Sequence, residues 1–317
     1  MRLLAGVGAL VTALAVPSAA CADRGVTSPG RVLALARSGY SVAFLSAPGP
    51  GHCGPRVLLW DLVSRGVSTL GRHPDLLCEE GPSTGSGVTD LAVAHRRVLW
   101  LAYAGGNQRD WLLYTATLTR PVERRLELRT VDVDAPAPIV VGVASEYVLP
   151  YSIGSTVKVL ADDGRLLYRW RAPGRVTNTT AYNREVAVFV AGGRCYVLSP
   201  RGTVEATYTF PAGAVHEFAL AQVGLVVQLP GGRIEIRKGA RVTRASIPAR
   251  GRMLDFSQHV LLYRLGDQIR ARRIPTGTDV LLRRGPLAQL EHNGLSYAAG
   301  RRVYSVAMVN VLARLAR

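Results

Sequence analysis

One pentapeptide, Gly81-Pro82-Ser83-Thr84-Gly85, matches the G-x-S-x-G pattern that surrounds the nucleophilic serine of many hydrolases. In those enzymes the serine lies on a sharp turn between a strand and a helix, which exposes its hydroxyl. Here proline directly precedes Ser83, the neighbouring residues are serine, threonine and glycine, and a strand-like run follows. The pattern therefore predicts a flexible loop, and it assigns no catalytic residue.

Histidines are the other candidates for chemistry. No H-E-x-x-H pair, P-loop, dinucleotide-binding or haem-attachment motif accompanies them. They act together only if the fold gathers them in one place, for example at a central channel, and otherwise they are ordinary surface residues. The sequence predicts no cofactor and no metal site, and it leaves open whether the protein is an enzyme. The six histidines are His52, His73, His95, His216, His259 and His292.

Cysteine placement favours a disulfide. Cys53 and Cys78 lie in polar stretches with glycine and proline, where a crosslink closes without distorting a strand. We therefore expect a Cys53–Cys78 disulfide. The alternative is a zinc site in which His52 and His73 join these cysteines, but no C-x-x-C or H-x3-H spacing supports it. Cys195 lies inside an apolar run and is predicted to be a buried free thiol.

The N-terminus has the three parts of an export signal. Arg2 provides positive charge, residues 3–16 are apolar, and small residues at 17–22 suit a signal peptidase. We expect residues 1–22 to be a signal peptide and residues 23–317 to be the mature domain. The predicted location is extracytoplasmic, secreted or in the cell envelope, where disulfides form.

Lipid attachment at Cys21 is the alternative processing. It is less favoured because Ser18 stands where a lipobox has a large aliphatic residue. No later segment has the length and apolarity of a membrane span, so the mature chain is expected to have no transmembrane segment.

The chain is strongly basic: 39 lysines and arginines against 22 aspartates and glutamates give a formal net charge of +17. Almost all of the positive charge is arginine, a bias typical of GC-rich bacterial genomes. Export makes nucleic acid an unexpected partner despite this charge. A protein, a small molecule or an anionic envelope polymer remains open, and arginines on solvated strand faces are the simpler interpretation.

A strand-length apolar run recurs along the chain, usually before a tight turn with glycine. From Gly154 onward these turns recur about every 34 to 39 residues, a spacing typical of repeat architectures. Each unit adds one strand before the run and two after it, with a second tight turn such as Asp162-Asp163-Gly164-Arg165. The runs are 42–45, 98–103, 147–151, 186–190, 225–229, 260–263 and 295–299.

Four strands in each of about seven units predict an all-β, single-domain β-propeller. Two β-sandwich domains or a β-helix are the alternatives, but the sequence has no linker near its middle. The last unit, 287–309, is short of a full fourth strand. We expect residues 23–28 to close the ring as its outer strand; the alternative is that residues 310–317 supply it.

One unit carries a family resemblance. Residues 56–61, Arg-Val-Leu-Leu-Trp-Asp, followed by Gly66, resemble the third strand of a WD40 blade with its Trp-Asp dipeptide. Only this unit has the dipeptide, and no Gly-His pair marks the blade starts. By pattern nearly the whole mature chain is similar to divergent bacterial propellers, including TolB-like and quinoprotein-like ones. The resemblance implies the fold and no particular ligand.

Wider spacing before Gly154 indicates loops inserted into the first two units, within 47–55, 73–87 and 105–110. Long loops on a rigid scaffold commonly carry binding sites, so His73, Arg109 and Trp111 are predicted to lie near a partner.

The predicted function is an exported, monomeric binding or interaction module of the cell envelope. The alternative is a hydrolase or lyase with its site across the central channel. A cluster of histidine, aspartate or glutamate at one channel mouth would favour the enzyme, and an apolar or arginine-rich face would favour the binding module.

Overall fold

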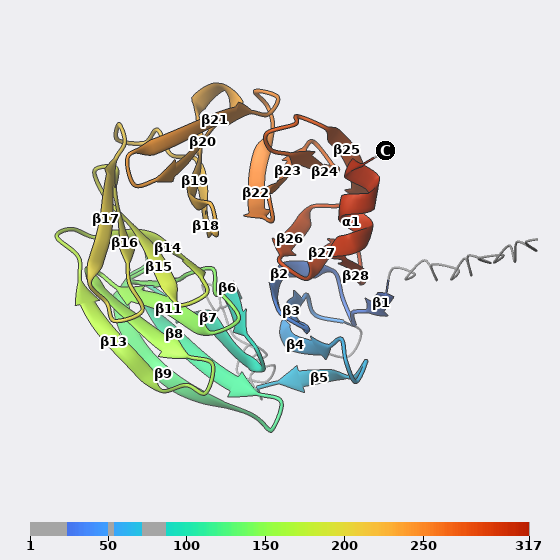
Figure 1. The fold of residues 1–317 in the computed structure, drawn as a ribbon. Helices are drawn as coiled ribbons and strands as arrows, with labels where there is room; N and C mark the ends of the chain where they lie inside the picture. The colour runs from blue at the N-terminus through green and yellow to red at the C-terminus, as the bar shows by residue number, and fades with distance from the viewer. Residues whose placement is uncertain (1–23, 50–53, 72–86, 317) are drawn as a thin grey trace, which may run out of the picture.

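The computed structural model describes residues 24–49, 54–71 and 87–316. They form seven four-stranded antiparallel sheets that stand around a central axis like the blades of a propeller (Figure 1). The predicted all-β propeller of about seven blades is therefore confirmed. Within the described residues there is one α-helix, α1 (Met308–Leu315), and no helix long and apolar enough to cross a membrane.

Each blade is numbered here from its innermost strand outward. Blade 1 contains β2 (Val32–Ser38), β3 (Ser41–Ser46), β4 (Arg56–Asp61) and β5 (Val67–Leu70); blade 2 contains β6 (Gly87–Ala94), β7 (Arg97–Gly105), β8 (Gln108–Thr117) and β9 (Arg120–Asp132). Blade 3 contains β10 (Ile139–Val141), β11 (Val148–Ile153), β12 (Thr156–Ala161) and β13 (Leu166–Arg171); blade 4 contains β14 (Val176–Tyr182), β15 (Glu185–Val190), β16 (Arg194–Leu198) and β17 (Val204–Thr209). Blade 5 contains β18 (Glu217–Ala221), β19 (Gly224–Leu229), β20 (Arg233–Lys238) and β21 (Arg241–Ser246); blade 6 contains β22 (Arg252–Ser257), β23 (Val260–Leu265), β24 (Gln268–Arg273) and β25 (Asp279–Arg284). Blade 7 contains β26 (Leu287–Glu291), β27 (Gly294–Ala299), β28 (Arg302–Ala307) and β1 (Arg24–Thr27).

The seven apolar runs are the second strands of the seven blades. Neighbouring blades cover both faces of such a strand, so alternation is lost and the whole strand is apolar. All six residues of β3 are buried, for example. The outermost strands β17 and β21 instead alternate between exposed and half-buried positions, which is where arginine and threonine are tolerated.

The Trp-Asp pair serves the fold in two ways. The Trp60 side chain is buried, 2% exposed, and packs with Phe44 and with Val303 of blade 7. The Asp61 carboxylate accepts hydrogen bonds from the backbone N–H of Val63 at 2.8 Å and of Ser64 at 3.3 Å, which shapes the turn into β5.

The N-terminal segment closes the ring, as expected. Strand β1 pairs antiparallel with β28, with Arg24 opposite Ser305 and Thr27 opposite Arg302. The alternative is wrong, because residues 308–315 form α1, which packs on β24, β25, β27 and β28 through Val311 and Leu315.

The antiparallel order gives the ring two faces. We call face I the side that carries the turns between first and second strands and between third and fourth strands. Face II carries the turns between second and third strands and the connections to the next blade.

Cys195 is confirmed as a buried free thiol on β16, and burial raises its pKa. The predicted Cys53–Cys78 disulfide lies outside the described residues, as do His52, His73, Cys21 and Ser83.

Candidate functional site

Two adjoining cavities lie along the ring axis. The inner one, of about 170 Å³, is lined by all seven blades and is mainly apolar, with Leu35, Leu91, Phe218 and Leu254 among its residues. The second, of about 280 Å³, lies where the face I turns of six blades meet, and its lining is polar. We call the second cavity the mouth, and it is the candidate site because so many blades contribute to it.

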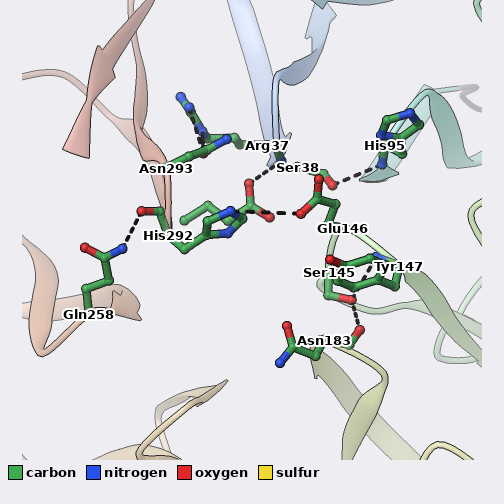
Figure 2. Close-up of polar contacts among 12 residues, drawn as sticks. Arg37, Ser38, His95, Ser145, Glu146, Tyr147, Asn183, Gln258, His292 and Asn293 are labelled. Atoms are coloured by element: carbon green, nitrogen blue, oxygen red, sulfur yellow. Dashed lines mark hydrogen bonds and ion pairs between the residues drawn. The ribbon is translucent and has the colours of Figure 1, made fainter. Parts of the chain in front are cut away.

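Blade 3 builds the mouth differently from the other blades. Its first strand, β10, is only three residues long, and six residues, 142–147, connect it to β11. The corresponding turns of the other six blades have two residues each. The longer connection places Ser145, Glu146 and Tyr147 at the mouth, where the ring of Figure 2 shows them opposite blades 1 and 7.

Arg37, on innermost strand β2, ties blade 1 to blade 7. Its side chain is 3% exposed, and Nη1 donates hydrogen bonds to Ser296 Oγ at 2.9 Å and Ser305 Oγ at 2.8 Å. Nη2 donates to Asn293 Oδ1 at 3.0 Å. Burial lowers the pKa of Arg37 to about 10, although the nearby Glu291 carboxylate opposes this shift. The guanidinium is thus committed to blade 7.

Two buried carboxyls also join blades. Asp255, on β22, accepts hydrogen bonds from the backbone N–H of Phe256 at 2.8 Å and from that of Leu290, in blade 7, at 3.0 Å. Burial raises its pKa to about 7. Glu291 accepts a hydrogen bond from the N–H of Gly39 in blade 1, and burial together with the charges of Glu146 and Asp255 raises its pKa to about 7, opposed by Arg37.

Glu146 reaches across the mouth. Its carboxylate lies 3.9 Å from His292 Nε2 of blade 7 and against Gly39 of blade 1, where a Cβ would stand 3.0 Å from Glu146 Oε1. Gly39 also has a positive φ of 54°, so both its conformation and this approach favour glycine. Glu146 and Glu291 therefore approach Gly39 together, and the mouth holds three carboxylates.

The two raised carboxyls predict a pH dependence of stability. Each binds its proton more tightly in the folded chain than in the unfolded chain, where the pKa is near 4. Their stabilising effect is complete below pH 4 and is lost as the pH rises to about 7. Urea unfolding at pH 5, 6, 7 and 8 should show Asp255→Asn with a flatter profile than the parent, by up to about 1.4 kcal/mol per pH unit between pH 5 and 7. Parallel profiles would contradict the assignment.

The sequence-predicted partner residues lie elsewhere. Residues 105–110 do not form a long loop but a tight turn, because β7 and β8 stay paired up to Gly105 opposite Arg109. Trp111 is in strand β8, 6% exposed, and packs in the core between blades 2 and 3. Arg109 stacks over the Tyr103 ring, with Cζ 4.6 Å from the ring centroid. His73 lies outside the described residues.

The histidines and the early loops do not share a face. His95, His259 and His292 are in face I turns, whereas the connections from β3 to β4, from β5 to β6 and from β7 to β8 join strand ends on face II. Of the histidines only His292 lines the mouth. Among the described residues, no group of three or more histidine, cysteine, aspartate or glutamate side chains is arranged to hold a metal ion.

The mouth residues Arg37, Glu146, Asp255 and Glu291 were not singled out from the sequence. A usable signal existed for Arg37 and Asp255, because each is a charge within a short apolar strand, β2 or β22. Such a charge needs a buried partner or a channel.

No protein-family model and no curated protein sequence matches the chain. Among solved structures, the chain is similar to a chain of the mitotic checkpoint complex, with a TM-score of 0.55 and 14% identity over 97% of this chain and 99% of that one. It is also similar to PorZ, an essential bacterial surface component of the type-IX secretion system of Porphyromonas gingivalis, with a TM-score of 0.56 and 11% identity. That match covers 90% of this chain and 38% of PorZ.

At these identities the likeness concerns the fold alone. It agrees with the blade order and with the Trp-Asp strand of blade 1. The chain is a divergent, WD40-like β-propeller of seven blades.

Proposed function

We propose that this protein is an exported, monomeric binding module of the cell envelope that holds a partner at the mouth on face I. The propeller fold supports an interaction role, and the N-terminal signal pattern supports export. The observation that carries the proposal is the convergence of six blades on one polar cavity. A rigid ring with a single recessed polar site is suited to recognition without rearrangement.

The same acidic cluster makes a hydrolase or lyase the second candidate, because carboxyls with a pKa near 7 suit general acid–base catalysis. Binding is favoured over catalysis by how these groups are used. Both oxygens of Asp255 accept backbone N–H groups, and Glu291 accepts the N–H of Gly39. These carboxyls are committed to joining blades, which leaves Glu146 as the least constrained acid.

Site-specific photo-crosslinking in cells tests the proposal. A benzophenone amino acid replaces Tyr147, at the mouth and 44% exposed, or Leu33, on the same kind of innermost strand but toward face II and 47% exposed. We expect one reproducible adduct from position 147 and none from position 33, with the chain in the extracytoplasmic fraction and its first 22 residues removed. Equal adducts from both positions, or an unprocessed cytoplasmic chain, would contradict the proposal.

A separate assay addresses the second candidate. Turnover of chromogenic esters or glycosides that is lost in both Glu146→Gln and Glu291→Gln would support the enzyme instead.

A further inference from the structure

A third cavity, of about 400 Å³, lies between blades 4 and 5 on face I. It shares Tyr182, Asn183 and Leu220 with the mouth, so the two hollows adjoin. The third cavity extends outward as far as Tyr208 on β17, the outermost strand of blade 4. We call the mouth and this cavity together the groove. It leads from the ring axis toward the rim, which is a shape for an elongated ligand.

The groove carries negative charge on a chain whose net charge is +17. Its inner part has Glu146, Asp255 and Glu291, while the guanidinium of Arg37 is turned into blade 7. Its outer part has Glu185 and Glu205, which lie close enough that the Glu205 charge raises the pKa of Glu185 beyond the effect of burial.

The two cations of the outer part are already occupied. Arg237 forms an ion pair with Glu235 at 2.7 Å and stacks over the Phe210 ring, 4.3 Å from its centroid. Lys238 Nζ donates a hydrogen bond to the backbone carbonyl of Gln222 at 3.2 Å. The carboxylates therefore set the charge that a ligand meets.

We propose that the groove binds an extended segment of a partner protein, with a lysine or arginine side chain of that segment in the mouth. This inference rests on the proposed function and specifies the ligand of the same site. A cation placed among Glu146, Asp255 and Glu291 gains favourable interactions that an anion cannot, so the groove is complementary in charge to a basic segment.

The rest of the lining suits a peptide. Apolar groups, Leu220, Leu225 and the Tyr208 ring, stand beside the amide of Asn183, so the walls can contact side chains and hydrogen-bond a main chain. A folded helix, about 10 Å wide with its side chains, does not fit in a mouth of about 280 Å³. An extended chain does, since it places a single side chain at a time.

Binding of a cation should depend on pH. The groups facing Glu291 are Arg37 of β2, Glu146 of the β10–β11 connection and Asp255 of β22, with His292 beside Glu146. A bound lysine favours the ionised carboxylates, so the complex releases protons and its affinity should rise from pH 6 to pH 8.

The test uses pools of acetylated, amidated heptapeptides that have a fixed central residue and random flanks. The central residue is lysine, arginine, norleucine or glutamate, and the mature protein is the immobilised bait. We expect the lysine or arginine pool to be retained at least fivefold more than the norleucine pool, and the glutamate pool least. Norleucine keeps the length of lysine without its charge, so equal retention would overturn the proposal. Spermine is the competing small polycation: tight spermine binding without peptide retention would also overturn it.

Variants locate the binding. Glu146→Gln, in the mouth, and Glu205→Gln, in the outer part, should each weaken the best peptide at least threefold. Asp267→Asn is the matched control, because Asp267 is an exposed acid in a face II turn, ion-paired to Arg284 at 2.9 Å, and it should have no effect. An unchanged affinity in Glu205→Gln would overturn the groove. Failure of all peptides with an intact crosslink at position 147 would reject this inference and leave the proposed function standing.

Discussion

Replacing Arg37 with methionine should lower the free energy of unfolding by about 3–5 kcal/mol, because it removes a buried charged donor and leaves its acceptors unpaired. The guanidinium serves Asn293, Ser296 and Ser305, all of blade 7. These are the contacts between the first and last blades of the ring that lie nearest the mouth. Methionine fills a similar volume, so the loss measures the hydrogen bonds and not a large cavity.

Urea unfolding followed by tryptophan fluorescence measures this loss. Arg165→Met is the matched control, since the Arg165 side chain is 70% exposed and its ion pair with Asp163 is long, 3.9 Å; its effect should be within about 0.5 kcal/mol. If Arg37→Met does not fold, Ser305→Ala removes one acceptor and should cost about 1 kcal/mol. A loss below 1 kcal/mol in Arg37→Met would mean that the buried arginine does not hold the ring closed.

The fold was predictable because its strongest sequence signal is repeated. The second strand of each blade is buried on both faces and therefore reads as a continuous apolar run, as in Val186–Val190 of β15. The turn after it needs a positive φ, which glycine supplies at Gly154 and Gly300. Each copy strengthens the same interpretation, so a weak local signal becomes a reliable one over the chain.

The mouth was not predictable by the same means. Arg37 and Glu291 stand more than two hundred positions apart, and they meet because the ring closes. The pattern of apolar runs places strands, but it does not say which charge faces the axis. The six-residue connection 142–147 was also missed, because attention to glycine-rich turns favours the turn after the second strand.

The C-terminal helix had a signal that went unused. Met308, Val311, Leu312 and Leu315 have the i, i+3, i+4, i+7 spacing of an amphipathic helix. In the structure Met308, Val311 and Leu315 are buried against blades 6 and 7. A search for strands alone therefore assigned residues 310–317 to the wrong kind of element.

Deleting residues 24–27, the whole of β1, should destabilise the chain and make it aggregate. The deletion removes the pairing with β28, the hydrogen bond from Arg24 Nη1 to the Leu62 carbonyl at 2.7 Å, and the packing of Val26 beside Val303. We expect a loss of roughly 2–3 kcal/mol, which lowers the melting temperature by about 5–10 °C in a domain of this size. Strand β28 then presents an open edge, which other chains can pair with.

Removing residues 309–317 is the matched truncation, because it also shortens the final blade. It exposes apolar surface that Val311 and Leu315 cover, so it should lower the melting temperature too, but it opens no strand edge and should leave the chain monomeric in size-exclusion chromatography. The two variants separate closure by pairing from closure by packing. A synthetic peptide of residues 24–31, added to the β1 deletion, should restore both melting temperature and monomer, since it supplies the missing strand to an otherwise complete blade. A β1 deletion that melts within 1 °C of the parent and stays monomeric would show that the ring does not depend on its N-terminal strand.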